Sequence, residues 1–158
     1  MGILTPVARR VGGIRWMPKL LPQIVVVDKL LQRVTRDRFT ILDLAGLPNL
    51  VLATTGRKSG LPRSSPLLCT PDGDRILIAG SYFGGPKEPL WVKNIEANPS
   101  VTVRVSGVES QRTARLLEGS ERAAAWEKML AVWPNYAMYE QRTDRTIKVF
   151  ELTAPAAG

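Results

Sequence analysis

The chain is built from short strand-like segments separated by turns, and this pattern restricts its fold more than any other feature. Seven segments are rich in Val, Ile, Leu and Thr: 39–44, 50–55, 65–70, 75–79, 101–105, 111–117 and 147–152. Between two of them, Pro71-Asp72-Gly73-Asp74 is typical of a hairpin turn. Because successive strands with few intervening helices pair with their neighbours, we predict a mainly β, α+β fold. An antiparallel barrel is favoured over a doubly wound parallel sheet.

Three segments have helical spacing instead. In residues 22–35 apolar side chains recur every three or four positions, which predicts an amphipathic helix. A second helix is expected at 89–97, and a third begins at Ser120 as its N-cap and ends before Pro134. In the third helix an apolar stripe should face inward: Trp126, Met129, Leu130 and Trp133. We divide the chain into a basic helical arm (1–38), a barrel domain (39–153) and a frayed tail (154–158).

The residue types that are missing exclude several kinds of catalysis. Histidine is absent and Cys69 is the single cysteine. An internal disulfide, a multi-cysteine or histidine-bearing metal site and a Ser-His-Asp or Cys-His nucleophile system are therefore excluded. We predict no metal centre, a reduced cytoplasmic environment, and a reaction whose active group is supplied by an organic cofactor.

The net charge of +8 is concentrated near the N-terminus. Residues 1–40 contain eight basic and two acidic residues, a balance of +6, which leaves +2 for the rest of the chain. Such an arm can approach an anionic membrane surface, a nucleic acid or an anionic ligand. Its longest uncharged run, 20–27, is far shorter than the roughly 20 apolar residues of a spanning helix, and no secretory cleavage site follows. The helix at 22–35 can pack on the protein core or lie on a membrane surface.

The segment TTGRKSGLPRSSPLL, residues 54–68, has the chemistry of an anion-binding loop. Gly56 and Gly60 permit turns that other residues resist, and backbone N–H groups in such a turn can converge on an oxyanion. Three cations, Arg57, Lys58 and Arg63, can add charge-assisted hydrogen bonds. A phosphate or carboxylate ligand is the functional interpretation, and a solvated β-turn is the alternative.

Two further groups could contribute to a binding site. Residues 84–91, GGPKEPLW, combine a glycine pair with a helix start, where free N–H groups favour anions. Residues 133–139, WPNYAMY, place Tyr136 and Tyr139 on one face of a short helix. Each group also has a purely structural interpretation, in which Trp91 anchors the core and the two tyrosines pack against it.

Taken in order and spacing, these groups resemble the deazaflavin-dependent nitroreductase and quinone reductase family, whose members use reduced coenzyme F420. The resemblance covers about residues 48–152 and is carried by four motifs: TTGRKSGLPRSSPLL, DGDRILIAGS, GGPKEPLWVKNIEANPSVTV and WPNYAMYEQRTDRTIKVFEL. It implies a split β-barrel similar to those that bind FMN, with F420 as the cofactor and FMN less favoured. A polyanionic cofactor tail also suits the basic balance of the chain.

The resemblance gives roles to particular residues. The loop that holds the cofactor's anionic tail, a phosphodiester followed by glutamates, matches Arg57, Lys58 and Ser59. The strand along the ring system matches Arg63, Ser64, Ser65, Pro66, Leu67 and Leu68. Two more walls of the groove match Ala79, Gly80, Ser81 and Tyr82, and Leu90, Trp91, Val92, Lys93 and Asn94. Tyr136 matches a tyrosine over the pocket where substrate stacks on the cofactor, and it is flanked by Trp133 and Tyr139.

The implied reaction is hydride transfer from C5 of the reduced deazaflavin to an electrophilic carbon of a stacked substrate. Water, or the hydroxyl of Ser81 or Tyr136, supplies the proton. Quinones, activated enones or lactones, and nitroaromatics are the expected substrates. Three residues depart from the pattern of a nitroreductase member: Leu68 and Trp133 replace tyrosines, and Tyr82 replaces a lysine. These exchanges argue against nitroimidazole activation and suggest a bulkier, less polar substrate.

Two other classes of protein compete with this interpretation. A non-catalytic split-barrel carrier would bind a flavin-like or tetrapyrrole cofactor without turnover. A nucleic-acid-binding or membrane-surface module would use the high pI, but aromatic residues make up only 6% of the chain, too few for a base-stacking platform. We therefore expect a monomeric enzyme with a small-molecule partner, no nucleic acid, and a peripheral membrane contact through residues 1–38 as the open alternative.

Overall fold

A computed structural model describes residues 22–23, 26–27, 30 and 46–157 of the chain. In chain order its elements are strands β1 (Asn49–Thr55), β2 (Pro62–Leu68), β3 (Thr70–Asp72) and β4 (Arg75–Ala79), the short 3-10 turn η1 (Tyr82–Gly84), helix α4 (Leu90–Ala97), strands β5 (Ser100–Val105) and β6 (Val108–Leu117), helices α5 (Gly119–Val132) and α6 (Tyr136–Arg142), and strand β7 (Val149–Thr153).

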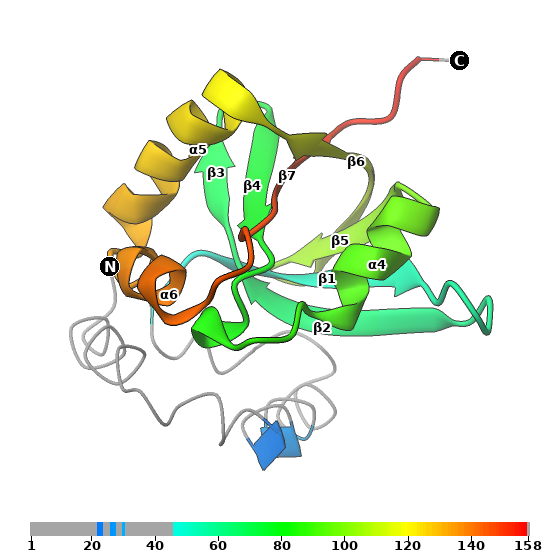
Figure 1. Cartoon of the computed structure of the whole chain (residues 1–158). Coiled ribbons are helices and arrows are strands. Elements are labelled where there is room, and N and C mark those ends of the chain that lie inside the picture. The colour runs from blue at the N-terminus through cyan, green and yellow to red at the C-terminus, as the bar shows by residue number, and fades with distance from the viewer. Residues whose placement is uncertain (1–21, 24–25, 28–29, 31–45, 158) are drawn as a thin grey trace.

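The seven strands form one antiparallel sheet in the order β2-β1-β5-β6-β7-β4-β3. Its two edge strands, β2 and β3, are consecutive in the chain and are separated by Cys69 alone. Because one residue cannot bridge the two ends of a flat seven-stranded sheet, the sheet curls into a half-barrel (Figure 1). This is the split-barrel architecture that the sequence resemblance implied, and the prediction of an antiparallel barrel is confirmed.

Two hairpin turns set the register of neighbouring strands. Asp72 pairs with Arg75, so Gly73 and Asp74 form a two-residue turn in which Gly73 has a left-handed φ of 61°. This confirms the turn predicted between these strands. At the other hairpin Val105 pairs with Val108 across Ser106 and Gly107, which both have positive φ.

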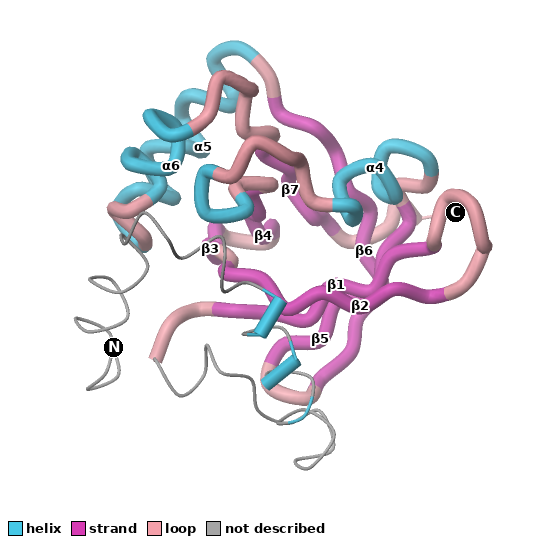
Figure 2. The backbone as a smooth tube through the Cα atoms, turned by 60° about the horizontal axis from the view of Figure 1, so that its bottom comes forward, coloured by secondary structure: helices cyan, strands magenta, loops and turns pink. Residues whose placement is uncertain are grey.

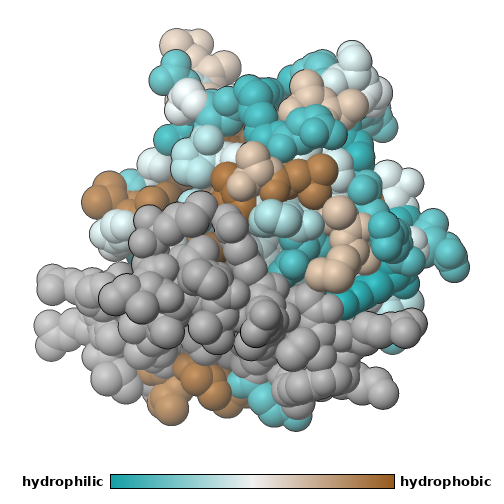
Figure 3. Space-filling view, turned by 90° about the vertical axis from the view of Figure 1, so that its left-hand side faces the viewer, coloured by the Kyte–Doolittle hydropathy of each residue, from teal (hydrophilic) through white to brown (hydrophobic). Residues whose placement is uncertain are grey.

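Helices cover two apolar regions of the curled sheet (Figure 2). Trp91 and Val92 of α4 pack with strand residues of one cluster, and the Trp91 ring meets Phe150 edge-on at 5.9 Å. Helices α5 and α6 supply the aromatic side chains of the other cluster. In the predicted stripe of α5, Trp126, Met129 and Trp133 are buried and Leu130 is half-buried. Where the side that carries α5 and α6 is drawn in colour, its surface is mostly hydrophilic, with smaller hydrophobic patches (Figure 3).

Some local predictions differ from the structure. The single strand predicted at 65–70 is two strands. The Cys69 N–H donates to the Pro48 carbonyl at 3.0 Å and so continues the register of β2 with β1, and from Thr70 onward the chain pairs with β4 instead. The prediction that Ser120 is the N-cap of α5 is wrong. The helix begins at Gly119, and Glu118 occupies the N-cap position, where its carbonyl accepts a hydrogen bond from the Arg122 N–H.

Parts of the N-terminal predictions fall outside the described residues. The strand at 39–44, most of the helix at 22–35 and the division between an arm (1–38) and a barrel domain lie there, although residues 22–23, 26–27 and 30 are helical. In the described part of the chain, no helix combines the length and apolar character needed to cross a bilayer.

Candidate functional site

A surface pocket of about 300 Å³ lies where three segments meet. The loop after β1 contributes its first glycine, both cations and its serine, β2 contributes two residues, and α4 contributes three residues from its first two turns. The lining residues are Gly56, Arg57, Lys58, Ser59, Arg63, Ser65, Leu90, Trp91 and Asn94. The structure thus brings together two segments that the sequence analysis had singled out separately.

The loop between β1 and β2 is closed by its own backbone. The Gly56 N–H donates to the Leu61 carbonyl at 2.8 Å, and the Gly60 N–H donates to the Gly56 carbonyl at 2.8 Å. A Cβ at Gly56 would lie 2.7 Å from Oγ of Ser59 and 3.1 Å from the Leu61 carbonyl oxygen, so a side chain here would displace the Ser59 hydroxyl and crowd this carbonyl. Oγ of Ser59 accepts from the Leu61 N–H at 3.2 Å, which leaves the Ser59 hydroxyl proton available to a ligand.

Asn94 of α4 anchors this loop to the sheet. Its Oδ1 accepts from the Arg57 N–H at 3.2 Å, and its Nδ2 donates to Oγ1 of Thr54 at 3.2 Å. Asn94 and Thr54 are both buried, so both ends of this bridge are shielded from water. The Asn94 side chain therefore fixes the position of the Arg57 backbone, which lines the pocket.

The pocket has the electrostatic character of an anion site. Arg57, Lys58 and Arg63 are exposed, and none of them forms an ion pair with a described residue. The first turn of α4 faces the same pocket, and N–H groups at a helix start have no partner within the helix. Three uncompensated cations and a helix N-terminus fit a ligand that carries several negative charges.

Residues 79–82, predicted to form a second wall of the cofactor groove, adjoin α4. Ala79 and Gly80 are buried, Ser81 is half-buried and Tyr82 is exposed. A Cβ at Gly80 would lie 2.8 Å from Cγ2 of Val92 and 3.7 Å from Cδ of Pro89, so this wall starts against the beginning of α4. The family resemblance assigns these residues to a wall of the cofactor groove, and this role stays a prediction.

The predicted substrate residues lie in the core rather than at the pocket described above. Tyr136 is 3% exposed and its ring lies 6.0 Å from that of Tyr139, which confirms that the two tyrosines share a face of α6. Nε1 of Trp133 donates to the Tyr139 hydroxyl at 3.2 Å. Burial raises the pKa of Tyr136 well above its usual value and that of Tyr139 to about 12. Both hydroxyls are therefore protonated at neutral pH, and the role of Tyr136 as proton donor stays a prediction.

The remaining predicted residues divide between surface and core. Ser64 and Lys93 are exposed, Pro66 and Leu67 are half-buried, and Val92 is fully buried. Leu68 packs against the aromatic cluster that contains Tyr136. Two residues with a structural part at the site were not predicted: Thr54, which holds Asn94, and Arg145, which bonds the second wall. No local sequence signal marks either one, because their partners are far away in the chain.

A curled antiparallel sheet with a ligand pocket at its side defines the protein as a split-barrel protein, and comparisons with known proteins place it more closely. The model of the family described as F420H(2)-dependent quinone reductase matches residues 31–154. An F420H(2)-dependent quinone reductase of Mycobacterium tuberculosis is 32% identical over 143 residues, which cover 88% of this chain and 96% of that protein.

Two solved structures agree with this match. An F420-H2 dependent reductase (FDR-A) is 40% identical with a TM-score of 0.62, covering 66% of this chain and 93% of its own. A structure described as a domain-swapped dimer is 36% identical with a TM-score of 0.64, covering 80% of this chain and 96% of its own.

The chain belongs to the F420H2-dependent quinone reductase family. It is therefore an oxidoreductase, and coenzyme F420 is the cofactor that the family implies. This confirms the cofactor and the enzyme class expected from the sequence. The chemistry of the pocket is consistent with it, since its donors suit an anionic group of the kind that the cofactor's tail carries.

Proposed function

We propose that this protein reduces quinones with reduced coenzyme F420, and that the pocket between the β1–β2 loop and α4 holds the anionic tail of the cofactor. The observation that carries the proposal is the set of three cations, Arg57, Lys58 and Arg63, that surround the pocket without an acidic partner in the described part of the chain. When bound, the reduced deazaflavin supplies the hydride.

The residues of this chain would then bind and orient. Arg57 and Lys58 would contact the phosphodiester and glutamates of the tail, and the Ser59 hydroxyl would donate to the same group. Positioning alone contributes several kcal/mol to such reactions, because it removes the need to bring two reactants together in the transition state. Activated enones, lactones and nitroaromatics belong to the same proposal as further electrophiles.

Titration with F420 and FMN side by side tests the cofactor site. F420 should bind more tightly and its affinity should fall as salt is added, because its tail offers more charges to the three cations than one phosphate does. Tighter binding of FMN would contradict the proposed tail site. Mixing the protein with reduced F420 and menadione then tests the reaction: saturable oxidation supports an enzyme, and binding without turnover supports the carrier alternative.

We expect a monomer, as the sequence analysis predicted. The solved relative described as a domain-swapped dimer makes the oligomeric state a necessary measurement. Light scattering after size-exclusion chromatography would give the mass in solution. Deleting residues 1–38 and measuring binding to anionic vesicles and to F420 would separate a membrane role of the arm from the cofactor site.

A further inference from the structure

The second wall has an unusual backbone conformation. Ser81 is right-handed, with φ −76° and ψ −39°, and the next three residues all have positive φ: 46° at Tyr82, 55° at Phe83 and 74° at Gly84. Two of these three are aromatic residues, which rarely adopt the left-handed region. Such a conformation persists only when surrounding contacts hold it in place.

Arg145 holds this segment through several hydrogen bonds, and Nη1 of Arg142 adds one to the Phe83 carbonyl at 3.4 Å. The Arg145 guanidinium donates to three carbonyls of the segment: Nη1 to Gly80 at 2.8 Å, Nη2 to Ser81 at 2.9 Å and Nε to Gly85 at 3.2 Å. The planar fork of an arginine places donors on three separate nitrogens and so reaches carbonyls that are spaced apart, whereas the three donors of a lysine share one nitrogen. From the other side, Gly84 packs so closely against α6 that an added Cβ would lie 2.7 Å from the Tyr139 carbonyl oxygen.

The charge of Arg145 has no acidic partner within ion-pair distance among the described residues. Burial lowers its pKa, and Glu88, the one carboxylate whose charge acts on it, forms its own ion pair with Lys148 at 3.3 Å. An arginine that only stabilised the fold could equally be paired with a carboxylate. Here the guanidinium of Arg145 donates to backbone carbonyls, and its positive charge has no acidic partner in the described part of the chain.

These contacts leave the donors of the segment free. The Gly84 N–H bonds the Ser81 carbonyl and the Gly85 N–H bonds the Tyr82 carbonyl, whereas the N–H groups of Ser81, Tyr82 and Phe83 have no acceptor in the described part of the chain. A right-handed residue followed by a left-handed one makes successive N–H groups converge, and such concave sites bind anions.

We propose that Arg145 is a positioning residue, which holds residues 80–85 so that the N–H groups of Ser81, Tyr82 and Phe83 can donate to the substrate oxygen that gains negative charge when the hydride arrives. The inference rests on the proposed function. The segment begins against Pro89 and Val92 of α4, next to the pocket assigned to the cofactor's tail. The reduced substrate then takes its proton from solvent.

Two substitutions at Arg145 and one matched control test the inference. R145M removes both the charge and the fork, and R145K keeps the charge but loses the fork. R122M is the control, because the Arg122 guanidinium also donates to a backbone carbonyl, that of Ile147, at 2.8 and 3.1 Å. Three quantities are measured on each protein: amide hydrogen exchange of residues 80–85 without cofactor, the dissociation constant for F420, and the single-turnover rate of hydride transfer to menadione.

For both Arg145 variants we expect amide exchange at Gly80, Gly84 and Gly85, whose N–H groups are hydrogen-bonded in the wild type, to be at least about tenfold faster than in the wild type. The hydride-transfer rate should fall about 10- to 100-fold, because oriented donors to a developing charge are lost. The dissociation constant for F420 should change less than about threefold, since the tail site is intact. R122M should leave the local exchange and the hydride rate unchanged.

Unchanged exchange in the segment, or a wild-type hydride rate in either Arg145 variant, would overturn the inference. A wild-type rate in R145K alone would mean that charge acts without positioning. If R145M does not fold, R145K decides, since it keeps the charge and the length of the side chain. Failure of the proposed function looks different: the wild type itself would then fail to oxidise reduced F420, and the inference would fall with it.

Discussion

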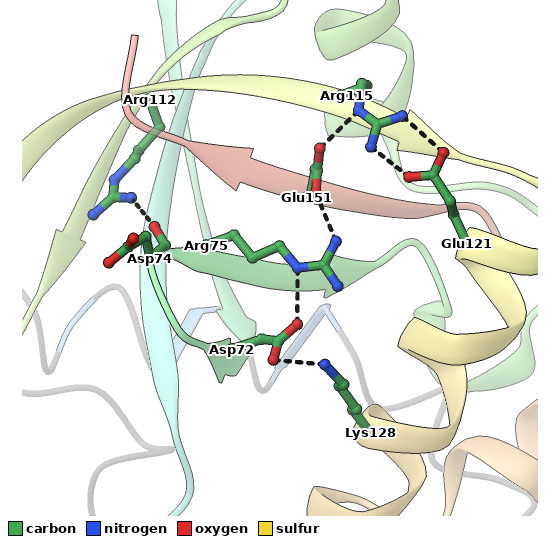
Figure 4. Close-up of polar contacts among 8 residues, drawn as sticks. All are labelled: Asp72, Asp74, Arg75, Arg112, Arg115, Glu121, Lys128 and Glu151. Carbon is green, nitrogen blue, oxygen red and sulfur yellow. Dashed lines mark hydrogen bonds and ion pairs between the residues drawn. The ribbon is translucent and has the colours of Figure 1, made fainter.

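Glu151 on β7 accepts a hydrogen bond from Nη1 of Arg75 on the neighbouring strand β4, at 2.8 Å (Figure 4). Its other carboxylate oxygen accepts from Nε of Arg115 on β6 at 2.7 Å. Glu151 is buried, and the network extends from these two arginines to Asp72, Glu121 and Lys128, so it joins the four strands β3, β4, β6 and β7 to α5. One carboxylate thus connects the central strands on this side of the half-barrel.

Replacing Glu151 with glutamine should lower the free energy of unfolding by about 2 kcal/mol at pH 7, because two arginines lose a buried, charge-assisted acceptor. Urea denaturation measures the change. Glu109→Gln is the matched control, since it breaks the more exposed pair with Arg104 and should cost less than about 0.5 kcal/mol. Equal losses in the two variants would contradict the central role of Glu151.

The same carboxylate predicts how stability depends on pH. Burial raises the pKa of Glu151, but the hydrogen bonds from Arg75 and Arg115 outweigh it, and the pKa lies below its usual value of 4.5. A carboxylate with a lowered pKa stabilises the fold fully above its unfolded-state pKa, and this contribution is lost as the pH falls through its folded-state pKa. Below about pH 4.5 the unfolding free energy of the wild type should therefore fall more steeply than that of Glu151→Gln. If the unfolding free energies of the two proteins fall in parallel with pH, protonation of Glu151 is not linked to folding.

Removing two cations of the β1–β2 loop should weaken binding of F420. We expect at least a tenfold rise in its dissociation constant, about 1.4 kcal/mol, for the double substitution R57A/K58A, because both charges lack a protein partner in the described part of the chain. Isothermal titration at low and high salt measures it. R112A is the control: Arg112 bonds the Asp74 carbonyl on another part of the sheet. Unchanged affinity in R57A/K58A would remove the basis of the proposed site.

Asn94 should affect cofactor affinity through the loop it anchors. Asn94→Leu removes the acceptor of the Arg57 N–H and the donor to Thr54, and we expect about tenfold weaker binding of F420. Asn98→Leu is the matched control, because Oδ1 of Asn98 accepts from the Ser100 N–H at the exposed end of the same helix. If both variants bind F420 like the wild type, Asn94 has no part in shaping the pocket.

Two glycines with left-handed φ should respond differently to alanine. Gly84→Ala adds a Cβ 2.7 Å from the Tyr139 carbonyl oxygen and should cost at least about 2 kcal/mol of unfolding free energy. Gly73→Ala has a similar φ of 61° with nothing within 4 Å of the new Cβ, so only the backbone cost of about 1 kcal/mol applies. Denaturant titration of both variants tests this difference, and equal costs would show that α6 yields around Gly84.

Much of the fold follows from local sequence. The strand at 75–79, the turn at Gly73-Asp74 and the inward stripe of α5 were predicted because each depends on backbone preferences and on the spacing of apolar residues within one segment. The end of β2 was not predicted, because it lies where the chain changes its pairing partner from β1 to β4, and pairing between strands is not set by the local sequence. The start of α5 was missed since Ser120 has the right residue type for a cap while Glu118 occupies the position.

The candidate site also combines features that the local sequence predicts with features that depend on remote contacts. The family was readable from motifs that lie in sequence order, and the spacing of glycines and cations that predicts an anion-binding loop is also local. The sequence alone therefore determined the class of protein, its cofactor and the chemistry of the loop.

Only the tertiary structure decided how these pieces meet. Asn94 reaches the Arg57 N–H, Arg145 reaches the carbonyls of Gly80, Ser81 and Gly85, and Tyr136 lies in the core beside Tyr139. Such contacts join residues that are far apart in the chain or depend on which face of a helix packs inward. They are set by the register of the strands and the curl of the sheet, and no local preference of the residues involved specifies either one.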